Sequence, residues 1–181
     1  MRSWAVVFLA AVSLPLVAQD PRYSSKLAPY VASPSRVVDL MLEMARIKPG
    51  ETVYDLGSGD GRILIAAAER FKAKAIGIEI SPSLVAAANE EIQRAGVADR
   101  VKVIQGDVLQ TDLSGADVVT LYFDTDANAK LRPQLEKYLK PGARIISHDH
   151  EIPGWKAARI EKTEERRSHT IYLYEIPAAK Q

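Results

Sequence analysis

Short apolar runs alternate with segments of helical periodicity through most of the chain. Runs typical of buried strands cover residues 51–56, 74–80, 101–105, 116–123 and 143–147, and runs of helical spacing cover residues 34–47, 62–70, 83–95 and 128–139. Buried strands of a parallel sheet read as continuous apolar runs, whereas amphipathic helices repeat with a period of about 3.6 residues. The strict alternation predicts an α/β fold with a doubly wound, mostly parallel sheet.

The last part of the chain breaks this alternation. Residues 155–162 and 170–176 are β-rich runs joined by a charged turn. The two-residue alternation in the second run is typical of an antiparallel hairpin. We expect this C-terminal hairpin to complete a seven-stranded sheet within one domain, residues 34–181.

The N-terminal 18 residues have the pattern of a targeting segment. Arg2 precedes a mostly apolar run from Trp4 to Val17, and the small residue Ala18 follows it. The run matches a secretory signal peptide and is short for a membrane span, which needs about 20 apolar residues. We expect residues 1–18 to be a signal peptide or a short N-terminal anchor, so the protein is exported, periplasmic or membrane-associated; a cytoplasmic location is the alternative. Residues 19–33, with prolines at 21 and 29, predict an extended lead-in.

Candidate chemistry begins at the first predicted strand-to-helix turn, where residues 53–61 read V-Y-D-L-G-S-G-D-G. Three glycines permit positive φ there and let a ligand approach the backbone: Gly57, Gly59 and Gly61. The turn does not match the dinucleotide fingerprint, because Arg62 stands where that pattern needs glycine, and no P-loop sequence follows. Asp55 disfavours a polyphosphate and favours a ligand that carries positive charge.

Acidic residues follow the ends of four successive predicted strands: Asp55, Glu79, Asp107 and Asp124. Ligands of open α/β sheets bind at the carboxyl ends of the strands, so the fold would gather these acids along one edge. Each could instead cap a helix or face solvent, but four in sequence favour a shared site. Glu79 lies 18 residues after Gly61, close to where nucleotide-binding βαβ units place the acid that binds a ribose diol.

With D-L-G-S-G-D-G, Glu79 and Gly106-Asp107 in this order, residues 30–176 resemble the class I S-adenosylmethionine-dependent methyltransferases, which have a Rossmann-like fold. The resemblance implies that the glycine turn contacts the methionine part of the cofactor, that Glu79 binds the ribose hydroxyls and that Asp107 approaches the adenine amino group. The implied cofactor-binding set is Tyr30, Asp55, Gly57, Ser58, Gly59, Gly61, Glu79, Ile80, Asp107 and Val108. S-adenosylmethionine carries a sulfonium, an ammonium and a diol but no phosphate, which suits an acid-bearing turn.

Several segments also resemble the small protein lysine methyltransferases of archaea and mitochondria. They are P-Y-V-A-S-P (29–34), V-T-L-Y-F (119–123), L-R-P-Q-L (131–135) and L-K-P-G-A-R-I-I-S-H-D-H-E-I-P-G-W (139–155). This resemblance implies a lysine acceptor, with Tyr30 closing over the cofactor. The chain departs from those relatives at Ala32, where proline is usual, and at His150, where an aromatic residue such as phenylalanine is common. A small-molecule methyltransferase and a non-catalytic S-adenosylmethionine-binding relative stay open as alternatives.

The candidate catalytic residues follow the fourth and fifth predicted strands. A lysine acceptor, with a free pKa of about 10.4, must lose a proton before it attacks. We expect Asp124 or Asp149 to orient the acceptor amine and Tyr122 to line the methyl channel, although such loop acids can also merely satisfy backbone groups. Carboxylates at 124, 126, 149 and 151 could supply oxygen ligands, but their spacing is not diagnostic, and we expect no metal.

Composition narrows the partners. The formal net charge is +1, so no basic excess indicates a nucleic-acid partner. Cysteine is absent, which excludes disulfides and thiolate nucleophiles. The sequence Y-F-D-T at 122–125 lacks the D/N-P-P-Y/F motif of adenine, cytosine and glutamine methyltransferases. The short chain leaves little room for a large lid, which favours an open site for a protruding side chain; we expect a monomer.

Overall fold

The computed structural model describes residues 27–164, 167–177 and 179–180. The expected signal peptide or anchor, residues 1–18, lies outside these ranges, as does the lead-in up to residue 26. Residues 27–33 of the lead-in are described and contain no helix or strand. Helix α1 (Ser35–Met44) begins the domain.

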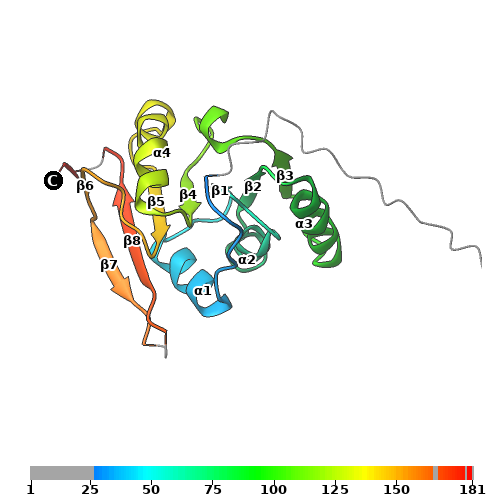
Figure 1. Cartoon of the computed structure of the whole chain (residues 1–181). Helices are drawn as coiled ribbons and strands as arrows, with labels where there is room; N and C mark the ends of the chain where they lie inside the picture. The colour runs from blue at the N-terminus through cyan, green and yellow to red at the C-terminus, as the bar shows by residue number, and fades with distance from the viewer. Residues whose placement is uncertain (1–26, 165–166, 178, 181) are drawn as a thin grey trace, which may run out of the picture.

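Seven strands form one sheet in the order β3-β2-β1-β4-β5-β8-β7 (Figure 1). They are β1 (Thr52–Leu56), β2 (Lys74–Glu79), β3 (Val101–Gln105), β4 (Val118–Leu121), β5 (Arg144–His148), β7 (Arg159–Lys162) and β8 (Thr170–Glu175). The pairings among β1 to β5 are parallel, whereas β8 runs antiparallel to both β5 and β7. The expected α/β fold and its antiparallel C-terminal strands are confirmed. Strand order reverses between β1 and β4, the kind of switch point at which open α/β sheets bind ligands.

Helices cover both faces of the sheet (Figure 1). Helices α1, α2 (Arg62–Phe71) and α3 (Pro82–Arg94) pack on one face, and α4 (Thr125–Tyr138) packs on the other. A short 3₁₀ helix, η2 (Val108–Gln110), lies on the side of α4.

Strands β4 and β5 show why their sequences read as continuous apolar runs. In β4, Val118 packs with α1 and α2 while its neighbour Val119 packs on the side of α4. In β5, Ile146 and Ile145 divide in the same way. Because both faces are covered, successive residues that point in opposite directions are all buried.

The expected strand over residues 155–162 is wrong in one respect, because it is two strands. Strand β6 (Trp155–Lys156) pairs with β9 (Ala179–Lys180) as a separate two-stranded sheet, and only β7 joins the main sheet. Trp155 is 3% exposed, lies 5.8 Å from the ring of Tyr174 and donates its Nε1–H to Glu136 of α4. These contacts hold the backbone of β6 over the face of α4, so it does not continue along the edge of β8.

No helix within the described part of the chain is both long enough and apolar enough to cross a membrane.

Candidate functional site

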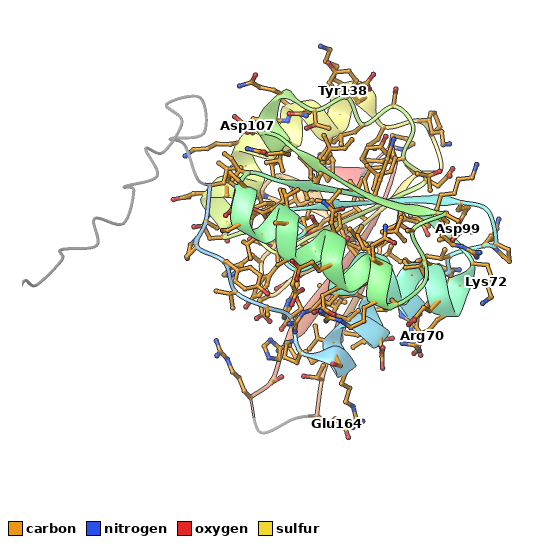
Figure 2. The ribbon with its side chains drawn as sticks, turned by 90° about the vertical axis from the view of Figure 1, so that its right-hand side faces the viewer. Arg70, Lys72, Asp99, Asp107, Tyr138 and Glu164 are labelled. Carbon is orange, nitrogen blue, oxygen red and sulfur yellow. The ribbon has the colours of Figure 1, made fainter. Side chains whose placement is uncertain are left out.

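A pocket opens at the carboxyl ends of the parallel strands, and the lead-in covers it. It is lined by residues 27–33 of the lead-in, by 55–58, 60, 62 and 63 around the glycine turn, by 79–81 and 84 after β2, by 107 and 108 after β3, and by 122 and 123 after β4. Figure 2 shows Asp107 and Asp99 at opposite ends of β3, and the pocket lies at the end marked by Asp107. The predicted edge of the sheet therefore carries the pocket.

The three glycines of the turn have different tasks. All adopt positive φ, 74° for Gly57, 54° for Gly59 and 80° for Gly61. A Cβ on Gly57 would lie 2.9 Å from the ring of Phe123, and one on Gly59 would overlap the ring of Tyr30. Of the three glycines only Gly57 lines the pocket, since Tyr30 covers Gly59, and Gly61 faces helix α3.

Gly77 in β2 is a supporting residue that sequence reasoning missed. A Cβ there would lie 2.6 Å from Leu64 and would overlap the side chain of Ser58. The glycine lets the turn pack directly on β2. The signal that could have found it is a lone glycine inside an apolar strand, which often marks a close approach of another segment.

Asp55 is buried at the base of the pocket, with 3% of its surface exposed. Its Oδ1 accepts a hydrogen bond of 2.7 Å from the hydroxyl of Thr120 in β4. Burial raises the pKa of Asp55 to about 7, the charges of Glu79 and Asp60 add to the rise, and the Thr120 bond opposes it. A carboxyl in this state gains from a positive charge beside it.

Glu79 ties the glycine turn to β2. Its Oε2 accepts the backbone N–H of Gly59 at 2.9 Å, and its Oε1 accepts that of Ser81 at 2.8 Å. The residue is 6% exposed and lines the pocket. Each oxygen keeps acceptor capacity, so Glu79 can support the turn and still bind a diol.

Asp107 lines the pocket beside Val108, and the next residue on the β2 side, Ile80, also borders it. The Asp107 carboxylate caps η2 by accepting the backbone N–H of Leu109 at 2.9 Å. The structure thus brings Asp55, Glu79 and Asp107 together with the apolar residues expected beside them.

The lead-in is fixed over the turn by Arg62. Its guanidinium pairs with Asp60 at 2.6 Å and donates a hydrogen bond of 2.9 Å to the carbonyl of Ser33. Tyr30 and Val31 lie at the rim and are 49% and 57% exposed. Asp60 and Arg62 were not among the predicted site residues.

Tyr122 forms the wall of the pocket after β4, and a buried polar cluster lies behind it. The Tyr122 ring stacks on His148 with centroids 3.8 Å apart, and its hydroxyl donates to Asp149 Oδ2 at 3.3 Å. Asp149 Oδ1 accepts the backbone N–H of Thr170 at 2.9 Å, and Asp149 has a positive φ of 61°. Asp149 itself is not a lining residue, so the two predicted residues contact each other but only Tyr122 borders the pocket.

Two histidines complete this cluster. His148 is fully buried and His169 is 5% exposed. Burial lowers the pKa of His148 to about 4 despite the nearby carboxylate of Asp149, so the ring is neutral at physiological pH. Although burial raises the pKa of Asp149, the Thr170 hydrogen bond and the two histidines outweigh it and lower the pKa overall.

Asp124 has a different place from the one expected of a catalytic acid. It is exposed and caps α4, accepting the backbone N–H of Ala127 at 2.8 Å. It is not a lining residue of the pocket. Asn128, one turn into the same helix, is fully buried and donates to the carbonyls of His150 and Glu151 at 3.3 and 3.1 Å, so it anchors the loop after β5.

Comparison with known proteins gives a family. A profile described as the ANTKMT methyltransferase domain matches residues 55–159. A protein-lysine N-methyltransferase of Saccharolobus islandicus is 45% identical over 150 residues, which are 82% of this chain and 93% of that protein. A lysine N-methyltransferase of Rattus norvegicus that is named for ATP synthase is 30% identical over 97% of this chain and 78% of that protein.

A solved structure is similar to the same extent. The crystal structure of an RNA methyltransferase from Salinibacter ruber in complex with S-adenosyl-L-homocysteine is 45% identical. It superposes with a TM-score of 0.78 over 81% of this chain and 94% of that chain.

Proposed function

The chain belongs to the class I S-adenosylmethionine-dependent methyltransferases that carry the ANTKMT methyltransferase domain, and on this premise we propose that its acceptors are lysine side chains of proteins. It is a methyltransferase, and its cofactor is S-adenosylmethionine. The observation that carries the lysine proposal is the 45% identity to a protein-lysine N-methyltransferase over almost the whole of that protein.

The pocket suits this cofactor in its charges and in its unsatisfied groups. Buried Asp55 gains from the positive charge of the ammonium or sulfonium, and Glu79 offers carboxylate oxygens to the ribose hydroxyls. Ser58 Oγ is buried without a hydrogen-bond partner, which leaves it available to a polar group of the ligand. Ile80, Val108 and Phe123 add apolar surface for a flat ring. When bound, the cofactor supplies an activated methyl group.

We assign the acceptor side to Tyr122 and give Asp149 a positioning role. Methyl transfer is an in-line displacement, so the protein has to hold the amine on the axis of the bond that breaks and keep water out. Tyr122 borders the pocket, and Asp149 holds its hydroxyl from behind. The structure gives Asp124 the task of a helix cap, so the positioning role passes to Asp149 alone.

The rim supports a macromolecular acceptor. Tyr30 and Val31 are two of the most exposed large apolar side chains in the described part of the chain, and both stand beside the opening. A protein that presents a lysine can cover these side chains while its ammonium group, after losing a proton, reaches past Tyr122. A small-molecule acceptor would leave them in water.

The test is incubation of the purified chain with isotopically labelled S-adenosylmethionine and cell extract of its native host. One portion is treated with ribonuclease and another with protease before the label is located by mass spectrometry. The proposal expects methylated lysines in protein that survive ribonuclease treatment. Label confined to RNA, the substrate class named for the Salinibacter protein, or to small molecules would contradict it.

Two variants separate catalysis from background in this assay. Asp149→Asn is expected to reduce labelling because it weakens the anchor of Tyr122, whereas Asp126→Asn, an exposed change in the first turn of α4, is expected to leave labelling unchanged. Equal labelling by the two variants would remove Asp149 from the site.

A further inference from the structure

The cluster behind Tyr122 brings three donor atoms to one point. His148 Nε2 and His169 Nδ1 are 2.9 Å apart, His169 Nδ1 and Asp149 Oδ2 are 2.9 Å apart, and His148 Nε2 and Asp149 Oδ2 are 3.4 Å apart. No other group of histidine and acidic side chains with this convergence occurs among the residues that the structure describes. We propose that His148, Asp149 and His169 bind a divalent first-row transition-metal ion, such as Zn²⁺ or Fe²⁺.

The size of the triangle fits metal coordination. Ligand atoms about 2.1 Å from one ion are about 3.0 Å apart at right angles and about 3.4 Å apart in a tetrahedron. The three separations fall at these two values. Two imidazole nitrogens and one carboxylate oxygen suit zinc and ferrous iron, whereas calcium and magnesium prefer oxygen ligands alone.

Hydrogen bonds within the cluster cannot satisfy all three atoms equally well. His169 Nδ1 carries at most one proton, yet it lies at the same distance from His148 Nε2 and Asp149 Oδ2. A single N–H points at one acceptor or between two, and hydrogen bonds weaken when they are bent. One cation at the centre interacts with all three atoms at once.

The surroundings have the features of an outer shell around a metal. Ser33 Oγ lies 3.0 Å from His148 Nδ1, so a proton held there leaves Nε2 with its lone pair toward the centre. The Thr170 backbone N–H orients Asp149 through its other oxygen. Both histidine rings are buried, and the positive φ of Asp149 marks a backbone held in place by its neighbours.

The sequence did not predict this site, because it considered only carboxylates close together in the chain. His169 is separated from Asp149 by 20 residues and reaches it through the antiparallel pairing of β5 and β8, in which His148 lies opposite Ile171. An ion here joins the end of β5 to the start of β8 and fixes the surface on which Tyr122 stacks. Its role is to hold the acceptor wall in place.

The test uses the full chain without a polyhistidine tag, freed of metal by a chelator and then titrated with Zn²⁺ and, as a spectroscopic probe, Co²⁺. The proposal expects one ion per chain, visible absorption bands of Co²⁺ with nitrogen and oxygen ligands, and a higher melting temperature with metal. His169→Ala should weaken binding by about 100-fold or more, because it removes a ligand, and Ser33→Ala should weaken it by about 10-fold to 100-fold.

His150→Ala is the matched control, because the chain has only three histidines and this one is outside the triangle. It should bind the ion as the unchanged protein does. Far-UV circular dichroism checks that His169→Ala is folded; if it is not, the stoichiometry and Co²⁺ spectrum of the unchanged protein decide. The proposal is overturned if the unchanged protein binds no Zn²⁺, if folded His169→Ala binds it equally well, or if Mg²⁺ binds as tightly. None of these results bears on which acceptor is methylated.

Discussion

The proton on Asp55 makes the stability of the cofactor-free protein depend on pH. The ordinary pKa of 3.8 is raised to about 7 in the folded chain, chiefly by burial. Such a difference corresponds to about 4 kcal/mol between the two protonation states. Because the folded state holds a proton that the unfolded state has lost, the free energy of unfolding falls as the pH rises from about 4 to about 7 and this contribution is constant above that.

The matching variant is Asp55→Asn, which keeps an acceptor for the Thr120 hydroxyl and cannot ionise. Between about pH 5 and about pH 8.5, the unchanged protein should lose about 3 kcal/mol relative to Asp55→Asn. The assay is urea unfolding of both proteins at the two pH values without cofactor, with Asp126→Asn as the control for loss of one surface acid. A difference between Asp55→Asn and the unchanged protein that is independent of pH would refute this account of the pKa.

Cofactor binding supplies a second readout of the same group. A positive charge placed in the pocket lowers the pKa of Asp55, so binding near pH 7 should release protons. Isothermal titration calorimetry in buffers with different heats of ionisation measures the number released. Asp55→Asn should bind S-adenosylmethionine more weakly and release fewer protons; equal release by both proteins would place the proton elsewhere.

Three further predictions concern other parts of the molecule. Gly77→Ala should lower the free energy of unfolding by about 1–3 kcal/mol through overpacking, whereas Gly106→Ala, whose Cβ would meet one atom at 3.9 Å, should change it little in the same denaturation assay. Tyr122→Phe should lower the rate of methyl transfer by about 5-fold to 10-fold while calorimetry finds cofactor affinity unchanged, because only the hydroxyl bond behind the pocket wall is lost; a loss confined to cofactor affinity would contradict this. Arg144→Ala should cost about 3 kcal/mol, because this largely buried guanidinium holds an ion pair and two backbone carbonyls, while exposed Arg159→Ala should cost less than about 1 kcal/mol. Equal costs in thermal unfolding would show that burial does not set the difference.

The cofactor half of the site was predictable because its signals are local. The glycines of the turn, the acid before it and the acids after β2 and β3 each follow from residues adjacent in the chain, and parallel strands bring their ends to one edge. Eight of the ten predicted cofactor residues line the pocket: Tyr30, Asp55, Gly57, Ser58, Glu79, Ile80, Asp107 and Val108. The other two, Gly59 and Gly61, shape the turn from behind.

The acceptor half was less predictable because it depends on contacts between distant segments. Asp124 and Asp149 were equivalent candidates in the sequence, yet the first caps α4 and the second anchors Tyr122. Which acid turns toward the site depends on how α4 starts and on the backbone after β5, and neither has a signature in neighbouring residues.

By itself the sequence determined the order of helices and strands, the glycine turn and the acidic edge, because hydrophobic period and glycine conformation act over a few residues. It also remains the sole source of the prediction for residues 1–18. Tertiary structure decided that Gly77 must admit Ser58 and that His169 meets His148 and Asp149. Those contacts arise from sheet order and antiparallel pairing, which bring together side chains that no local pattern connects.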